Sequence, residues 1–519
     1  MGRKSLIFSS LKMATATFSS RILGLVREQV MASMFGASGL TDAFTVAYRV
    51  PNMLRDLFAE GAFSSAFVPT FTKAKLDGKE GAKQFLWSMF IVLLLLTGLI
   101  ATTVIIFAPE VVALMTSKAF LEDTERAELC ITMVKIMAPF LTFISLSALF
   151  MGALNSLKIF FWPSMAPAFF NIVMIASMIL SPSLLISRGH HPIFSLAIGV
   201  LLGGFVQMLV QLPLIFKRGF GLPEKLTFSR HYIGSTLNKL GIGTIGIAAN
   251  QINLLITTIL ATGTVVGAVS WLTYAFRLFQ FPVGVLSVSI AGSNLVHFSE
   301  EWKAGRKEQA CAILRASYKF SWLVIIPALA LMFALSEQSV HLVFERGAFS
   351  ELDTEQSTLA LRSYLIGLPF YGLFKIFGPT FFSLNKAKVP VFISIFAITM
   401  NVIFCMTMVP KYGFSILALG TSLSIMVNCC LQAFFLQRYL DLGAKFFIDF
   451  SIIKYFISGL IVFALVHYLG QEFYVYKDGL FFRALQFIGI TITGLLCYGI
   501  TLLFMGEGKQ LKTILKKST

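Results

Sequence analysis

Charged residues interrupt three stretches of this sequence that are otherwise apolar enough to cross a membrane. The stretches lie at about residues 10–35, 41–72 and 265–298. A charged side chain at the centre of a bilayer costs roughly 2.5–3.5 kcal/mol, so we expect these groups to face a water-filled cavity or one another. The arginines within the three stretches are Arg21, Arg27, Arg49, Arg55 and Arg277.

Arginine is suited to holding a phosphate group inside such a cavity. Its planar guanidinium donates to two phosphate oxygens at once and keeps its charge at any physiological pH. The arginines therefore predict a cationic cavity that binds an anion. Lys375, within a further apolar stretch at about 357–384, is a candidate for lining the same cavity.

Acidic residues accompany these arginines. Counted from Asp42, Arg49, Asp56 and Glu60 follow at 7, 14 and 18 residues and share its helical face, and Arg55 lies about 100° round from Asp56. A further acid, Glu28, directly follows Arg27. One interpretation is that the acids form permanent ion pairs between the first two stretches. The other is that they pair with the arginines as gates, which the excess of basic groups favours.

The composition predicts an all-α polytopic membrane protein. The 519 residues are 56% hydrophobic and 13% charged, against about 25% charged in a typical soluble domain. Spans of about 20 apolar residues follow one another along the chain, with room for about fourteen. The short basic start lacks a small-residue cleavage site, so we expect the first helix to be retained rather than removed as a signal peptide.

The distribution of basic residues predicts the orientation of the chain. Of the 42 Lys and Arg residues, 27 lie in the two tails and the loops after even-numbered spans, and 7 lie in the loops after odd-numbered spans. Because cytoplasmic loops are enriched in basic residues, both termini are predicted to be cytoplasmic. The same distribution argues against nucleic-acid binding, despite the net charge of +17.

Shifting the chain against itself by 230 residues indicates an internal repeat. Pro139 then meets Pro369, and Asn171 meets Asn401. Accidental similarity between membrane helices is the alternative, but matched Pro and Asn favour a duplication of six spans, related by an axis along the membrane normal. The predicted regions are a first lobe at 1–216, a cytoplasmic connection at 217–236, a second lobe at 237–440 and a two-helix appendix at 450–506.

The sequence lacks the common signatures of an enzyme. There is no GxxxxGK[ST] phosphate loop and no HExxH metal motif, and the six cysteines form no CxxC pair. Gly241, Gly243 and Gly246 spell GxGxxG without a preceding strand, so close helix packing explains them better than a nucleotide site. We predict a transporter with no metal and no cofactor.

Near its start the chain resembles the MurJ (MviN) family of bacterial lipid II flippases, within the multidrug/oligosaccharidyl-lipid/polysaccharide exporter superfamily. The resemblance is carried by the segments FSSRILGLVRE, FGASGLTDAF and YRVPNMLRDLFAEGAFSSAFVPTF. It continues through MAPFLTFISLSALFMGALNS and WLTYAFRLFQFPVGVL and covers essentially the whole chain.

The resemblance implies two six-helix lobes around a central cationic cavity, and a groove for a polyprenyl tail in the last two helices. The family's functional arginines match Arg21, Arg27, Arg55 and Arg277, and its two acids match Asp42 and Glu60. Arg49 stands where relatives often have lysine. Asp56 and Phe276 depart from the residues of some relatives, which puts the local charge balance in doubt. A sodium site described for some members is not carried over, because the corresponding helices here lack Asp and Glu.

The expected function is therefore transport of lipid II, undecaprenyl diphosphate bearing a disaccharide–pentapeptide, across the bacterial inner membrane for peptidoglycan synthesis, cell-wall biogenesis and cell shape. Alternatives are a flippase for another polyprenyl-linked glycan, a multidrug exporter and a membrane-embedded transferase. The membrane potential is a candidate energy source, and the sequence does not identify a coupling ion. Expected partners are lipid II, membrane lipids and the cell-wall synthesis machinery.

Overall fold

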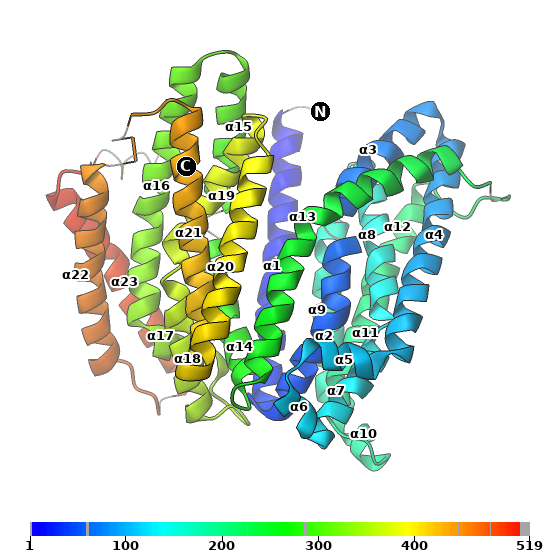
Figure 1. Cartoon of the computed structure of the whole chain (residues 1–519), viewed down its shortest axis with the longest axis horizontal. Coiled ribbons are helices and arrows are strands. Elements are labelled where there is room, and N and C mark those ends of the chain that lie inside the picture. Colours follow the sequence, from blue (N-terminus) through cyan, green and yellow to red (C-terminus); the bar gives the residue numbers. More distant parts are fainter. Residues whose placement is uncertain are drawn as a thin grey trace. The chain divides into compact units, whose positions relative to one another are not determined.

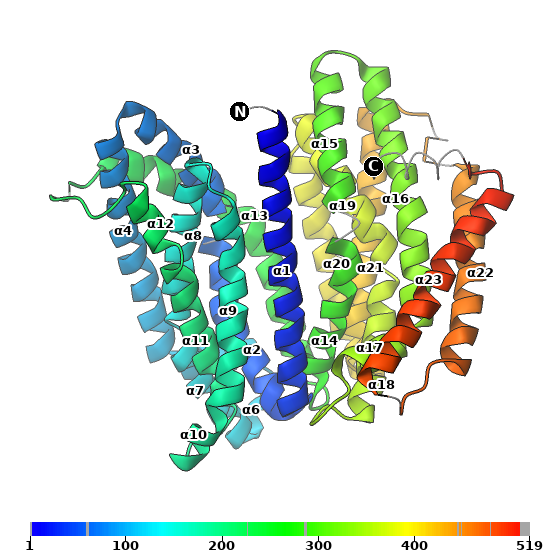
Figure 2. The same ribbon diagram turned by 180° about the vertical axis from the view of Figure 1, so that it is seen from behind.

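The computed structural model describes residues 3–58, 62–225, 227–284, 288–443, 446–447, 449–477 and 479–508. Within these ranges, side chains are described except at 3–14, 57, 58, 62, 64, 65, 239–250 and 288–294. All elements in the described ranges are helices, as Figures 1 and 2 show. The prediction of an all-helical membrane protein is confirmed.

The chain divides into two compact units, Met1–Ser270 (unit 1) and Trp271–Thr519 (unit 2). The helices of unit 1 are α1 (Arg3–Phe35), α2 (Gly39–Phe58), α3 (Ala62–Asp77), α4 (Lys79–Ile106), α5 (Ala108–Met115), α6 (Lys118–Glu122), α7 (Thr124–Met137), α8 (Phe140–Ser156), α9 (Phe161–Leu180), α10 (Pro182–Ser187), α11 (Phe194–Leu209), α12 (Leu212–Lys217) and α13 (Arg230–Thr262). Helix α14 (Ala268–Pro282) begins in the last three residues of unit 1. Unit 2 continues with α15 (Val288–Lys303), α16 (Lys307–Ala334), α17 (Ser336–Phe344), α18 (Glu351–Leu365), α19 (Leu368–Ser383), α20 (Lys388–Tyr412), α21 (Ser415–Tyr439), α22 (Phe450–Glu472) and α23 (Leu480–Phe504).

The boundary between the units differs from the predicted one. The sequence pattern placed the start of the second lobe at residue 237, within α13. In the structure α13 packs against α3 and α2, and both views show it beside α3. Packing therefore assigns α13 to unit 1, although its position in the repeat belongs to the second series of helices.

Helix lengths repeat along the chain. The 33-residue helices α1 and α13 begin 227 residues apart, and the 28-residue helices α4 and α16 begin 228 apart. Backbone details follow the same shift: the caps that end α4 and α16, Phe107 and Leu335, have φ/ψ of −100°/29° and −105°/25°. Lys158 (φ 61°) and Asn385 (φ 56°) are the left-handed residues that follow α8 and α19.

In the described residues, nine helical segments are long and apolar enough to cross a membrane, or up to ten if the bent pair α18 and α19 is one span. They include α4, α9, α16 and the last four long helices, α20 to α23. Helices α1 and α2, which carry several of the intramembrane charges, are outside this set. The chain is thus a multi-pass membrane protein, and the count of about fourteen spans stays a prediction.

Aromatic side chains form the core of unit 1 between α3, α4 and α8. The rings of Phe63, Phe67 and Phe71 stack along α3 with centroids 5.3 and 5.4 Å apart, and Phe85 of α4 stacks on Phe67 at 5.4 Å. All four are fully buried. Such stacks fix how α3 and α4 pack together.

The connection between α12 and α13 is bonded to the start of α4. The indole nitrogen of Trp87 donates to the carbonyls of Phe220 (3.0 Å) and Gly221 (2.8 Å). The Gln84 amide accepts from the backbone N of Thr227 at 2.8 Å and donates to the carbonyl of Lys225 at 2.6 Å. These bonds make the connection part of unit 1.

In unit 2 the start of α23 is bonded to α17 through a buried histidine. Nη1 of Arg483 lies 3.1 Å from Nε2 of His341, and the hydroxyl of Tyr474 lies 2.9 Å from Nδ1. Arginine can only donate, so Nε2 accepts and the ring is neutral, with its proton on Nδ1 directed at Tyr474. Glu345 lies 3.5 Å from the same Nε2.

Candidate functional site

Arg27 is held on the side of α1 that packs against α9 (Figure 2). Its Nη1 donates to Oδ1 of Asn171 at 3.1 Å, and its Nη2 donates to Oε1 of Glu28 at 2.5 Å. The ring of Phe170 lies 5.8 Å from the guanidinium carbon. Glu28 itself is buried. The guanidinium of Arg27 is therefore fixed from two directions.

The charges of α2 find partners within α2 and on α13. Nε and Nη2 of Arg55 donate to one carboxylate oxygen of Asp56 at 3.2 and 2.9 Å, and the other oxygen accepts from the amide of Gln251 at 3.3 Å. Nη1 of Arg49 donates to the hydroxyl of Thr258. Neutral side chains of α13 thus stabilise the charges of α2 without cancelling them.

Arginines outnumber acids among the described side chains of α1 and α2. Arg21 is exposed and makes no ion pair or hydrogen bond with the described residues. Arg27 and Arg55 are close enough to repel each other electrostatically. Among the described side chains at 15–56, on α1 and α2, the four arginines Arg21, Arg27, Arg49 and Arg55 stand against the three acids Glu28, Asp42 and Asp56. Asp42 also lies 3.4 Å from Arg126 of α7. Such guanidinium groups can attract an anion with several oxygen acceptors.

Asp42, at the start of α2, is completely buried. One carboxylate oxygen accepts from the backbone N and the hydroxyl of Ser270, at 2.9 and 2.7 Å. The other accepts from the backbone N of Gly267 at 2.7 Å and lies 3.4 Å from Nη2 of Arg126 on α7. A carboxylate that accepts N–H groups at the start of a helix, here α14, satisfies donors left unpaired there and opposes the positive end of the helix dipole. We call Asp42, Arg126, Gly267 and Ser270 the Asp42 latch.

Of the remaining predicted site residues, two lie in unit 2 and one lies outside the described residues. Arg277 is half-buried in α14, and Lys375 is exposed on α19, both within unit 2. Glu60 lies outside the described residues. The structure thus brings Arg27 together with Glu28, and Arg55 together with Asp56, while Asp42 contacts none of the predicted arginines.

Two residues of this site escaped the sequence analysis as functional candidates. Arg126 lies two residues before the apolar stretch at about 128–155, where it resembles an ordinary loop residue. Asn171 was noticed only as a matched position of the repeat. An asparagine in an apolar helix is a weak indication of a functional contact, because its buried amide requires hydrogen-bond partners.

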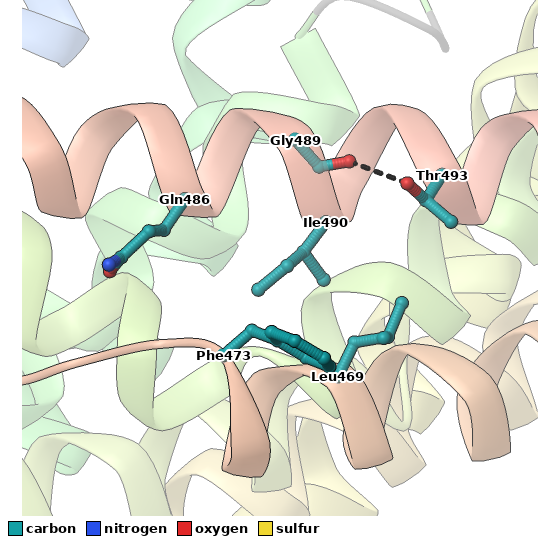
Figure 3. Close-up of a pocket in the computed structure, with 6 residues that line it drawn as sticks. All are labelled: Leu469, Phe473, Gln486, Gly489, Ile490 and Thr493. Atoms are coloured by element: carbon teal, nitrogen blue, oxygen red, sulfur yellow. Dashed lines mark hydrogen bonds between the residues drawn. The ribbon is translucent and has the colours of Figure 1, made fainter.

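A groove lies between α22 and α23, with a volume of about 440 Å³. Figure 3 shows the apolar side chains of both helices facing each other across it. The lining residues are Leu469, Phe473, Gln486, Gly489, Ile490 and Thr493. The hydroxyl of Thr493 donates to the carbonyl of Gly489 at 2.9 Å, which satisfies it within α23. A long apolar chain suits such a lining better than a polar ligand.

Among the described residues, no three His, Cys, Asp or Glu side chains gather as metal ligands would.

The family model described as "Lipid II flippase MurJ" matches residues 31–487. The chain belongs to the MurJ family. A "Probable lipid II flippase MurJ" from Buchnera aphidicola subsp. Schizaphis graminum (strain Sg) is 32% identical over 515 residues, covering 97% of each chain. The "Lipid II flippase MurJ" of Burkholderia cenocepacia (strain ATCC BAA-245 / J2315) is 34% identical over 426 residues and 81% of each chain.

Solved structures agree with the family. The fold is similar to "Lipid II flippase MurJ, inward closed conformation", with a TM-score of 0.79 and 27% identity over 95% of this chain and 99% of that one. It is also similar to an inward-facing multidrug resistance MATE transporter of the MOP superfamily, with a TM-score of 0.68 and 14% identity over 83% and 98%. The second likeness shows a shared fold alone.

Proposed function

We propose that this chain is a flippase that moves lipid II from the cytoplasmic to the periplasmic leaflet of the bacterial inner membrane by alternating access. Membership of the MurJ family and the similarity to solved MurJ support the proposal. The observation that carries it is the group of four arginines among the described side chains of α1 and α2, at membrane depth beside fewer described acids. An anionic head group that must cross the bilayer needs such groups at membrane depth.

The arginines would hold the diphosphate of the substrate. Arg21 is exposed, and Arg27 and Arg55 are oriented by Asn171 and Asp56. Arg49 and Arg277 would add positive charge along the path, with Lys375 as a further candidate. A diphosphate that enters would accept several charge-assisted hydrogen bonds from these guanidinium groups.

The acids would govern opening and closing. When the diphosphate binds Arg27 and Arg55, the carboxylates of Glu28 and Asp56 would leave these arginines and be solvated instead. Glu60 is proposed to act in the same way. The Asp42 latch joins α2 to the start of α14 through a neutral serine and a glycine. Loss of these bonds would free the connection at 263–270 to change conformation.

The remaining features complete the proposal. The groove between α22 and α23 would hold part of the polyprenyl tail. The ratio of 27 to 7 basic residues supports cytoplasmic termini. The membrane potential, worth about 2.3 kcal/mol per charge per 100 mV, would drive transport without a cofactor. Peptidoglycan-assembling enzymes would consume the product.

The experiment is complementation of a strain depleted of its own lipid II flippase. Arg27→Ala and Arg55→Ala should abolish growth at normal protein levels, while Arg306→Ala, which removes an exposed ion pair with Glu301, should complement fully. In parallel, lipid II exposed on the periplasmic side is measured by a membrane-impermeant cleavage assay. If the parent chain is produced but restores neither growth nor lipid II accessibility, transport of a different polyprenyl-linked glycan is indicated.

A further inference from the structure

Asn171 is a buried amide in the apolar sequence FFNIVMIASM of α9, 6% exposed. A buried amide costs free energy unless both its ends are hydrogen-bonded. Its Nδ2 donates to the carbonyl of Ser20 at 3.2 Å, and its Oδ1 accepts from Arg27 at 3.1 Å. Both partners lie on α1, so the donor and the acceptor of this side chain both form hydrogen bonds with that helix.

The contact orients Arg27 without neutralising it. Glu28 also holds the guanidinium, but it brings a negative charge that an incoming anion must outcompete. The amide of Asn171 has no such charge. A guanidinium has five N–H donors, and the contacts with Asn171, Met174 and Glu28 use three of them, which leaves two for a ligand.

The repeat provides a natural comparison for Asn171. Asn401, its match on α20, is also buried. There the Oδ1 accepts from the thiol of Cys405 at 3.4 Å. At the same shift of 230 residues, Thr257 stands at the place of Arg27. The asparagine therefore recurs in the repeat while the arginine does not, and Arg27 distinguishes the first copy.

We propose that Asn171 is a positioning residue that sets the orientation of Arg27 for diphosphate binding. The inference rests on the proposed function, because it assigns the substrate group to Arg27. A long, flexible side chain loses conformational freedom when it binds a ligand, and holding it in place beforehand reduces that loss. Removing Asn171 should therefore weaken binding through Arg27 and through no other arginine.

The test is a double-mutant cycle on the purified full-length chain, with lipid II and undecaprenyl diphosphate as probes. Asn171→Leu keeps the side-chain size and removes the amide. It should weaken binding of both probes about tenfold, the usual scale for losing a hydrogen bond to a charged group. In an Arg27→Ala background it should have no further effect, whereas combined with Arg55→Ala the two losses should multiply.

The controls separate positioning from structure. Asn401→Leu, at the matched position in unit 2, should change binding of either probe less than twofold. Asn171→Ser, which is too short to reach Arg27, should reproduce the loss if the leucine variant folds poorly. A loss that persists in the Arg27→Ala background would overturn the inference and indicate a packing role.

The remaining outcomes also decide the question. If Arg27→Ala weakens binding and Asn171→Leu does not, the inference fails and the proposed function stands. If Arg27→Ala itself binds both probes as the parent chain does, the proposed role of Arg27 fails, and the inference fails with it.

Discussion

The two units place a polar contact at the same point of the repeated fold, but they build it differently. In unit 1 the fourth residue of α2, Asp42, contacts the third residue of α7, Arg126. In unit 2 the fourth residue of α14, Trp271, donates its indole N–H at 2.8 Å to the third residue of α18, Asp353. In unit 1 the acid belongs to the first helix of the pair, and in unit 2 it belongs to the second. The neutral indole of Trp271 replaces the charged guanidinium of Arg126 as the donor.

The two carboxylates also differ in the other hydrogen-bond donors that they accept from. Asp353 also accepts from the backbone N and hydroxyl of Ser350, as part of the capping box that begins α18. Its partners are local and come with the helix. Asp42 instead accepts from Gly267 and Ser270, more than 220 residues away along the chain. The first contact is built into one helix start, while the second depends on a separate segment remaining in place.

The largest effect is expected from Asp42→Ala. It leaves Arg126 and the donors of Ser270 buried without their partner, which should lower the free energy of unfolding by about 3–5 kcal/mol. Arg126→Ala should cost less, because Asp42 keeps its three hydrogen bonds from Gly267 and Ser270. Reversible unfolding in a bilayer-like environment measures both. Equal losses would show that Arg126 is the main partner of Asp42.

Substitutions of the cationic residues should affect binding in unit 1 more than in unit 2. Arg27→Ala and Arg55→Ala should each weaken lipid II binding by about 1.5–3 kcal/mol, or roughly tenfold to a hundredfold. Lys375→Ala, an exposed cation on α19, should weaken it less. Titration of the purified variants with lipid II provides the measurement. An effect of Lys375→Ala as large as that of Arg27→Ala would contradict this asymmetry.

Trp271→Phe should have a smaller effect on stability. It removes one hydrogen bond to Asp353, which keeps its bonds within the capping box, so we expect a loss of about 1–2 kcal/mol. Lipid II binding should not change, because neither Trp271 nor Asp353 is among the groups proposed to hold the diphosphate. A change in binding without a change in melting temperature would place Trp271 in the moving part of the molecule.

The smallest effect should be a pH dependence confined to unit 2. Burial lowers the pKa of His341; the charges of Arg483 and Arg346 lower it further, and those of Glu345 and Glu337 oppose them. Tyr474 and Tyr476 are the remaining titratable groups against the ring. Below about pH 6.5 the unfolded chain binds a proton that the folded chain does not, so stability should fall as the pH drops through that value.

His341→Gln should flatten this profile. The melting temperature of the parent chain should fall more between pH 7.5 and 5.5 than that of the variant. The matching position on α5 is Ala113, so no such contribution is expected from the corresponding part of unit 1. If the melting temperatures of the parent chain and the variant change equally with pH, His341 is not the source of the pH dependence.

The sequence was a good guide to the helices and to the charged residues, and a poor guide to their partners. Hydropathy reveals Arg27, Arg55 and Asp42 because a charge in an apolar stretch is conspicuous. It does not reveal Thr258, Gln251 or Ser270, which are neutral and distant along the chain. Helical geometry also separated Arg55 from Asp56, yet adjacent long and short side chains can turn toward each other, as these two do. The assignment of α13 to unit 1 depended on packing that no periodicity contains.

The hydrogen bonds from Gln84 and Trp87 to the segment before α13 have a mechanical consequence. A loose linker would absorb displacement by changing shape. This segment is hydrogen-bonded to α4 near both of its ends, at Phe220 and at Thr227, so its shape can change little. Force applied along α13, a helix of about 50 Å along its axis, is therefore transmitted to the first turns of α4.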